Sequence, residues 1–100
     1  MSTAPELTVT HLPAEHRFEA HLAGDQVGVL DYVEVSERTI VYLSTRVPAE
    51  YEGRGIGSAL ARAALDDARA RGRAVVPRCW FVEGWIDRHP EYADLVSRDG

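Results

Sequence analysis

The sequence predicts an α/β protein: a mixed sheet of mostly antiparallel strands with one parallel pair, accompanied by two helices. The first half of the chain alternates apolar and polar residues, a period typical of strands. After Pro48 the apolar residues recur at helical spacing instead. A short β-branched run follows that helix, and a strand–helix–strand unit implies that its two strands are parallel. A chain of 100 residues is expected to form one domain, covering residues 1–100.

Four strands are predicted before Pro48. "LTVTHL" (7–12) is expected at an edge, and "RFEAHL" (17–22) alternates strictly, with its apolar residues on one face. "QVGVLDYVEV" (26–35) is partly apolar on both faces, which is typical of an inner strand. "TIVYLSTRV" (39–47) is a further β-branched run. Because the connections between these runs are short, the strands are expected to be antiparallel neighbours.

The second half of the chain is predicted to form a helix, a strand and a second helix. Apolar residues recur at helical spacing from Ile56, and Gly72 is a good residue to end that helix. "AVVPRCW" (74–80) indicates a short buried strand, and "FVEGWIDRH" (81–89) a short helix that Pro90 ends near Arg88. The two tryptophans, Trp80 and Trp85, are expected in the core, which is the commonest place for such large side chains.

Three glycines at alternate positions precede the first helix, in "EGRGIG" (52–57). The N-terminus of a helix leaves several backbone N–H groups unpaired, and these groups together with the helix dipole attract anions. Glycines let a phosphate approach that backbone without meeting a Cβ atom. The loop therefore indicates a phosphate cradle, with a flexible turn as the alternative. The P-loop is excluded because no Lys-Ser/Thr follows the last glycine.

Composition limits the partners and the compartment. A formal net charge of −5 argues against nucleic acid and against anionic membranes as partners. No basic-then-apolar leader and no membrane-length apolar run is visible, so a cytoplasmic protein is expected. Cys79 is the single cysteine, so no internal disulfide can form. The spacing of His11, His16 and His21 matches no metal-binding signature, so we expect solvated histidines on a strand surface and no metal site.

"YEGRGIGSALARAAL" (51–65) resembles motif A of the GNAT superfamily of N-acetyltransferases, and "CWFVEGWIDRHPEY" (79–92) resembles the short stand-alone branch of that superfamily. The resemblance implies a minimal GNAT-like fold that binds acetyl-CoA. It implies that the pantetheine arm runs between two parallel strands that splay apart, pairing with the backbone of Val47. The pyrophosphate would then lie on the motif A amides, which belong to Gly53, Arg54, Gly55, Ile56, Gly57 and Ser58. Glu52 departs from the motif's Gln/Arg, and Arg54 could supply the compensating charge.

The catalytic residues that are common in the superfamily do not stand at their usual positions in this sequence. Many members of the superfamily use a tyrosine in the second helix as an acid, but here the resemblance puts Ile86 in that place, and Arg46 stands where many carry a carboxylate. Cys79, at the predicted end of the parallel strand, is a candidate nucleophile that could take the acetyl group first. The alternative is that Cys79 is a small buried apolar residue. Asp31, on a valine-lined strand face, is a candidate base or the mark of a bulge or wet edge.

The resemblance implies an acetyl-CoA-dependent N-acetyltransferase that acts on an amine. The helices that usually lie between the first strands, and the last two strands, have no counterpart here, so the acceptor site is expected to be open. An open site suits an amine on a protein or peptide. Because the usual tyrosine and carboxylate are missing, a non-catalytic acyl-CoA-binding or sensing module is the alternative, and a plain interaction domain with a degenerate loop is a third.

Overall fold

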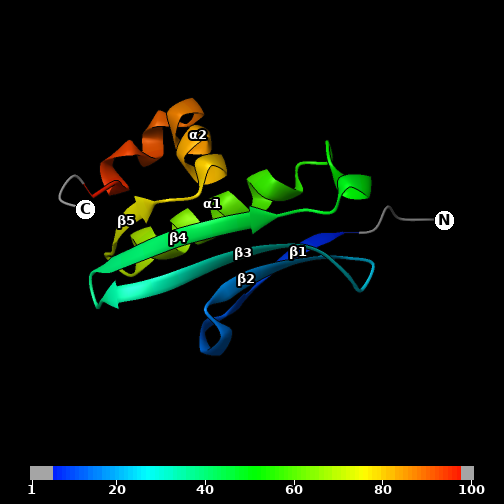
Figure 1. Ribbon diagram of the computed structural model, residues 1–100, viewed down its shortest axis with the longest axis horizontal. Helices are drawn as coiled ribbons and strands as arrows, with labels where there is room; N and C mark the ends of the chain where they lie inside the picture. The colour runs from blue at the N-terminus through cyan, green and yellow to red at the C-terminus, as the bar shows by residue number, and fades with distance from the viewer. Residues whose placement is uncertain (1–5, 98–100) are drawn as a thin grey trace.

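The computed structural model describes residues 6–97 and contains a five-stranded mixed sheet (Figure 1). The strands are β1 (Leu7–Leu12), β2 (Arg17–Leu22), β3 (Asp25–Ser36), β4 (Thr39–Arg46) and β5 (Ala74–Pro77). Their order in the sheet is that of the chain, and every neighbouring pair is antiparallel except β4 and β5. The predicted mixed sheet with one parallel pair is therefore confirmed.

Two α-helices follow the antiparallel strands, as predicted: α1 (Ile56–Ala70) and α2 (Trp80–Arg88). Gly72 takes a positive φ of 66° just beyond α1, and Pro90 follows the end of α2. The remaining turns are 3-10 helices: η1 (Pro13–Glu15), η2 (Ala49–Tyr51) and η3 (Pro90–Leu95). Only η1 lies between β1 and β2, so the connection that could carry additional helices is one short turn.

The core lies between the sheet and the two helices. Phe81 of α2 lies against Gly57 of α1, and residues of both helices join the strands in one apolar cluster. The N-terminus of α1 also presses closely on β3, because a Cβ atom at Gly28 would lie 2.9 Å from Cγ2 of Ile56. This close approach fixes where the first turn of α1 stands relative to the sheet.

One buried tyrosine ties the middle of the sheet to α1. The hydroxyl of Tyr42 donates a hydrogen bond of 2.6 Å to the backbone carbonyl of Ala64. Burial raises the pKa of this hydroxyl, so it stays protonated and keeps donating. Because the bond reaches a backbone group in the interior of α1, it helps to fix the position of the helix over β4.

The opposite face of the sheet is half open. Val33, Val35 and Leu43 are exposed there by 41%, 62% and 43%. β3 is an inner strand, as predicted, but its valines do not all share one face. Val27 occupies a bulge against β2 and is fully buried in the core. No α-helix among residues 6–97 covers Val33 and Val35, which explains their exposure.

Two of the side-chain expectations are wrong. Trp85 is fully buried, but Trp80 is 83% exposed. The two lie five positions apart in α2, which places them about 140° apart around a helix, so both cannot face the core. His11 is half-buried rather than solvated: its ring stacks on Phe18 with centroids 4.2 Å apart, and its Nε2 lies 2.6 Å from the Tyr32 hydroxyl.

Candidate active site

The parallel strands separate where β4 carries a bulge. Their pairing ends at Tyr42 and Pro77, and just beyond it two residues of β4, Leu43 and Ser44, oppose Asp31 of β3. A bulge bends its strand and increases the local twist, so β4 turns away from β5 at this point. The carbonyl of Tyr42 closes the end of the gap by accepting bonds of 3.1 and 3.0 Å from the N–H groups of Arg78 and Cys79. The gap between β4 and β5 has the shape that the resemblance implies for a cofactor arm.

The N-terminus of α1 faces this gap with free amides. Gly53 and Gly55 take φ values of 81° and 77°, a region that strongly favours glycine. No side chain caps the helix in the described structure, and the first amide bonded within it is that of Ala59, to the carbonyl of Gly55. The preceding N–H groups of the first turn are therefore available to an anion.

A cavity of about 370 Å³ lies between the end of β4, the first turn of α2 and these amides. Six of the predicted cofactor residues line it: Val47, Gly53, Gly55, Ile56, Gly57 and Ser58. Arg54 lies outside the lining, with its guanidinium 5.6 Å from the ring centre of Tyr51, which does line the cavity. The structure thus brings the loop residues together around one space and leaves Arg54 at its border.

Gly57 lines the cavity and also lies where α1 and α2 pack together. A Cβ atom there would lie 2.6 Å from Cζ of Phe81, so the glycine permits α2 to pack against α1. At Gly53 and Gly55 an added Cβ would meet nothing within 4 Å, and the positive φ is what requires glycine. Of the three glycines, two shape the loop and one permits the helix contact.

Four further lining residues were not predicted from the sequence: Thr45, Tyr51, Trp80 and Phe81. The spacing of motif A points only to the loop, and α2 comes into contact with that loop through tertiary packing. The exposure of Trp80 could have been predicted from the sequence, because helical spacing places it on the other side of α2 from the core residue Trp85. Glu52 is exposed at the cavity wall, beside the amides that would hold an anion.

Cys79 lies at the end of the gap but is not one of the lining residues. It is the N-cap of α2, is 5% exposed, and belongs to the apolar core. Its sulfur is 3.4 Å from Oγ1 of Thr45, a residue that does line the cavity. The burial of the sulfur and its contact with Thr45 favour the structural interpretation of this cysteine.

Two other ionisable side chains, those of Tyr92 and Asp31, already form hydrogen bonds within the protein. Tyr92 is buried, and its hydroxyl donates a 2.7 Å bond to Asp66 of α1, which raises its pKa. Arg46 of β4 donates a 2.7 Å bond from Nη2 to the carboxylate of Asp31 on β3. Asp31 also lies beside the bulge, as one reading of the sequence suggested.

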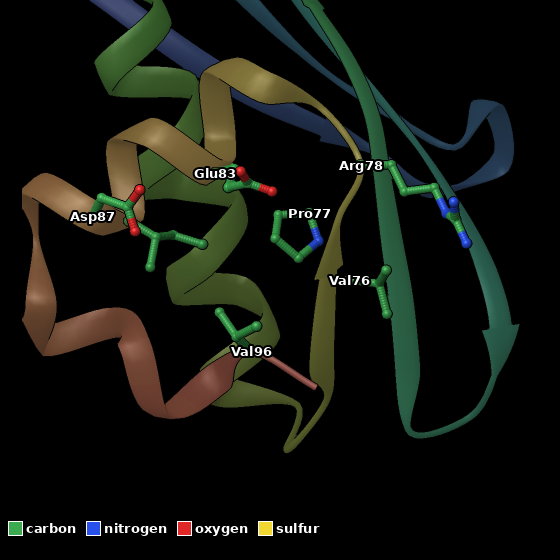
Figure 2. A pocket seen from close by; sticks show the side chains of 7 residues that line it. Val76, Pro77, Arg78, Glu83, Asp87 and Val96 are labelled. Atoms are coloured by element: carbon green, nitrogen blue, oxygen red, sulfur yellow. The ribbon is translucent and has the colours of Figure 1, made fainter. Parts of the chain in front are cut away.

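Two further cavities flank this region. One, of about 640 Å³, lies between β5, α2 and Val96, and Figure 2 shows Glu83 and Asp87 of α2 on its helical side. The other, of about 450 Å³, lies at the ends of β3 and β4 and shares Thr45 and Val47 with the 370 Å³ cavity. In residues 6–97 no helix is long and apolar enough to cross a bilayer, and no cluster of three or more His, Cys, Asp or Glu residues could hold a metal.

Comparison with known proteins identifies the family. Residues 17–95 match the family described as GCN5-related N-acetyl-transferase. The chain is 33% identical over 92 residues to Protein NATD1 of Bos taurus, which covers 87% of this chain and 81% of that protein. It is 28% identical over 99 residues to Protein NATD1 of Danio rerio, with 96% and 90% covered.

Two solved structures resemble the fold. A GCN5-like protein from Staphylococcus aureus matches with a TM-score of 0.71 at 22% identity, over 91% of this chain and 88% of that one. Ard1 from Thermoplasma volcanium matches with a TM-score of 0.59 at 26% identity, over 64% of this chain and 44% of the longer one. The fold and its splayed strands define an N-acetyltransferase-type protein. The chain belongs to the GCN5-related N-acetyltransferase family and is a short member of that superfamily.

Proposed function

We propose that this protein binds acetyl-CoA and transfers its acetyl group to an amine. The observation that carries the proposal is the cavity that extends from the end of β4, beyond its pairing with β5, to the free amides of the first turn of α1. A long ligand with a phosphate group at some distance from its reactive end suits such a space. Membership of the family supports acyl transfer, and the shape of the cavity supports acetyl-CoA as the acyl donor.

Different residues of this chain would bind different parts of acetyl-CoA. The amides that follow Gly55, with those of Gly53 and Arg54, would hold the pyrophosphate. Val47, just beyond β4, would pair its backbone with the pantetheine arm as an added strand does. Phe81 and Trp80 form the α2 wall along which that arm would pass. Arg54 would offset the charge of Glu52 at the rim.

The chemistry that acetyl-CoA supplies is a thioester. The amine must first lose its proton, since a lysine amine has a pKa of about 10.4. Its nitrogen then bonds to the carbonyl carbon, the C–S bond breaks, and the electron pair leaves with the sulfur. The ammonium proton goes to water, and the second proton, which the nitrogen loses as it becomes an amide, balances the thiolate. Amides at the edge of β4 beyond Tyr42 are not paired with β5, and such donors stabilise the charge that develops on the carbonyl oxygen.

The acceptor class that we propose is an amine on a protein or peptide. Only the short turn η1 connects β1 to β2, so no helices from that connection wall the site. Small-molecule acceptors are usually enclosed, whereas a chain segment can lie across an open surface. Acetylation of small polyamines but of no peptide would overturn this part of the proposal.

Coenzyme A should stabilise the fold strongly. At a ligand concentration about a hundredfold above the dissociation constant, binding adds about 2.7 kcal/mol to the free energy of unfolding. Each kcal/mol shifts the melting temperature of a domain of this size by about 4–8 °C, so a rise of about 10–20 °C is expected. Thermal unfolding followed by far-ultraviolet circular dichroism measures this rise.

The same measurement locates the phosphate site. Dephospho-CoA keeps the pyrophosphate and should stabilise almost as well as coenzyme A. Pantetheine has no phosphate for the amides to hold, so its effect should be much smaller. Equal stabilisation by pantetheine and coenzyme A would show that the α1 amides do not hold a phosphate.

Cys79→Ala should leave the coenzyme A shift nearly unchanged, because Cys79 does not line the cavity. If Cys79 takes the acetyl group first, mixing the protein with acetyl-CoA should add one acetyl mass to the peptide that contains it. We expect no such adduct, because the sulfur is buried against Thr45. Mass spectrometry decides the question: an adduct on Cys79 together with an inactive alanine variant would make this residue the nucleophile.

A non-catalytic acyl-CoA-binding module is the second candidate. Arg46 in β4 and the engaged hydroxyl of Tyr92 favour it, because neither can remove a proton from an amine near the gap. Release of free thiol from acetyl-CoA, measured with and without candidate amines, separates the two functions. Binding without amine-dependent thiol release would favour the module.

A further inference from the structure

The gap between β4 and β5 has one side free for a second substrate. The 370 Å³ cavity is bounded by the first turns of α1 and α2, so the helical side belongs to the proposed donor. On the opposite face of the sheet no α-helix among the described residues covers the strands, and Leu43 beside the gap is 43% exposed. A second reactant can therefore approach the gap from the open face.

Arg46 stands on that face at the β4 side of the gap. Its Nη2 donates to Oδ2 of Asp31 at 2.7 Å, and Asp31 also accepts a 3.3 Å bond from the hydroxyl of Ser44. The Arg46 side chain is still 69% exposed. A guanidinium has five N–H donors, so one bond to Asp31 orients the group and leaves most of its donors free.

Arg78 stands on the β5 side of the same gap. Arg78 directly follows β5, and its side chain is exposed. Figure 2 shows Arg78 extending over β4, away from Glu83 and Asp87. Glu83 and Asp87 line the 640 Å³ cavity together with Arg78, but the guanidinium of Arg78 points away from them.

We infer that the acceptor is a peptide segment with acidic side chains next to its reacting amine, held from the open face by Arg46 and Arg78. This inference rests on the function proposed above. Two guanidinium groups stand at the gap, and Asp31 pairs with only one of them, which gives this part of a chain of formal net charge −5 a positive rim. Guanidinium pairs well with carboxylates, often through two hydrogen bonds, and this pairing supplies the attraction.

The rim also affects the amine itself. Neighbouring cations disfavour a charged ammonium, so the two arginines favour the neutral amine that can attack a thioester. An acceptor rich in lysine or arginine would meet repulsion without a compensating contact. Acidic neighbours supply the attraction that brings the amine to the rim.

A cavity beside the rim could hold the peptide residues that flank the reacting amine. The 450 Å³ cavity at the ends of β3 and β4 includes Arg46 and the amide side chain of Gln26, and it shares Thr45 and Val47 with the proposed donor site. A segment bound across Arg46 could extend into this cavity. The acceptor then contacts the same stretch of β4 that borders the donor, which brings the two reactants together.

The test compares three peptides of equal length with a free amino terminus, one central lysine and a fluorophore at the carboxyl end. The flanking residues are all glutamate, all glutamine or all arginine. Fluorescence anisotropy measures their affinity for the protein saturated with coenzyme A, and initial rates with acetyl-CoA are measured in parallel. The glutamate peptide should bind best and the arginine peptide worst, with the preference disappearing in 0.5 M salt, where the screening length falls to a few ångströms.

Charge reversal identifies the residues. Arg46→Glu and Arg78→Glu should each weaken the glutamate peptide about fivefold, as expected for an exposed charge contact of about 1 kcal/mol. Arg38→Glu is the matched control, because it makes the same charge change in the β3–β4 turn and should leave the preference unchanged. Equal binding of all three peptides, or equal effects of the three variants, overturns the inference even if coenzyme A binds. Failure of coenzyme A to bind would instead remove the proposed function.

Discussion

Replacing Trp85 by alanine is expected to lower the free energy of unfolding by about 3–5 kcal/mol, the range for deleting a large aromatic side chain from a core. Trp85 is fully buried, stacks on His89 with ring centroids 3.7 Å apart, and lies beneath the guanidinium of Arg62. It joins α2, η3 and α1, so its loss leaves a cavity where three elements meet. Native domains are stable by only about 5–15 kcal/mol, so the variant should lie close to unfolding. Urea denaturation measures the difference.

Trp80→Ala is the matched control for this prediction. It removes the same side chain from the same helix, but at a position that is 83% exposed, so the change should stay within about 0.5 kcal/mol. If the two variants lost similar stability, the burial of Trp85 would not be what holds α2 in place. Trp85→Phe should cost less than the alanine variant, because the buried Nε1 that it removes has no hydrogen-bond partner among the described residues.

Local pattern was enough to predict the fold class. Strand alternation, the change to helical spacing after Pro48 and the glycine and proline that follow the helices all correspond to observed elements. These signals arise from contacts between residues close in sequence. Trp80 shows where such reasoning fails, because its apolar type indicated burial while its position in α2 turns it away from the core.

The site was harder to predict than the fold, because it depends on contacts between distant segments. Gly57 looked like part of a phosphate loop, yet the constraint on it comes from Phe81, which lies 24 positions further along the chain. Thr45 gave no signal of its own and is placed at the cavity by the bulge in β4. The pairing of Asp31 with Arg46 likewise follows from strand register, which no local pattern encodes.

Gly55→Val is expected to abolish most of the stabilisation by coenzyme A. Gly55 is the N-cap of α1, with a φ of 77° that a β-branched residue adopts only under strain. The variant must either keep this conformation or turn the first amides of α1 away from the cavity. In the first case the added methyl groups stand where a phosphate would approach. In the second case the amides no longer face the cavity. The rise of about 10–20 °C expected with coenzyme A should therefore fall to a few degrees.

Gly24→Val separates loss of the site from loss of stability. Gly24 has nearly the same backbone conformation, with a φ of 85°, and an added Cβ there also meets nothing within 4 Å. It lies in the turn between β2 and β3, and it does not line the cavity. Both variants should therefore lose about 1–2 kcal/mol of stability, the cost of a side chain in the left-handed region. Only Gly55→Val should also lose the coenzyme A shift. A full shift in Gly55→Val, or an equal loss in Gly24→Val, would mean that coenzyme A is not held by the amides of α1.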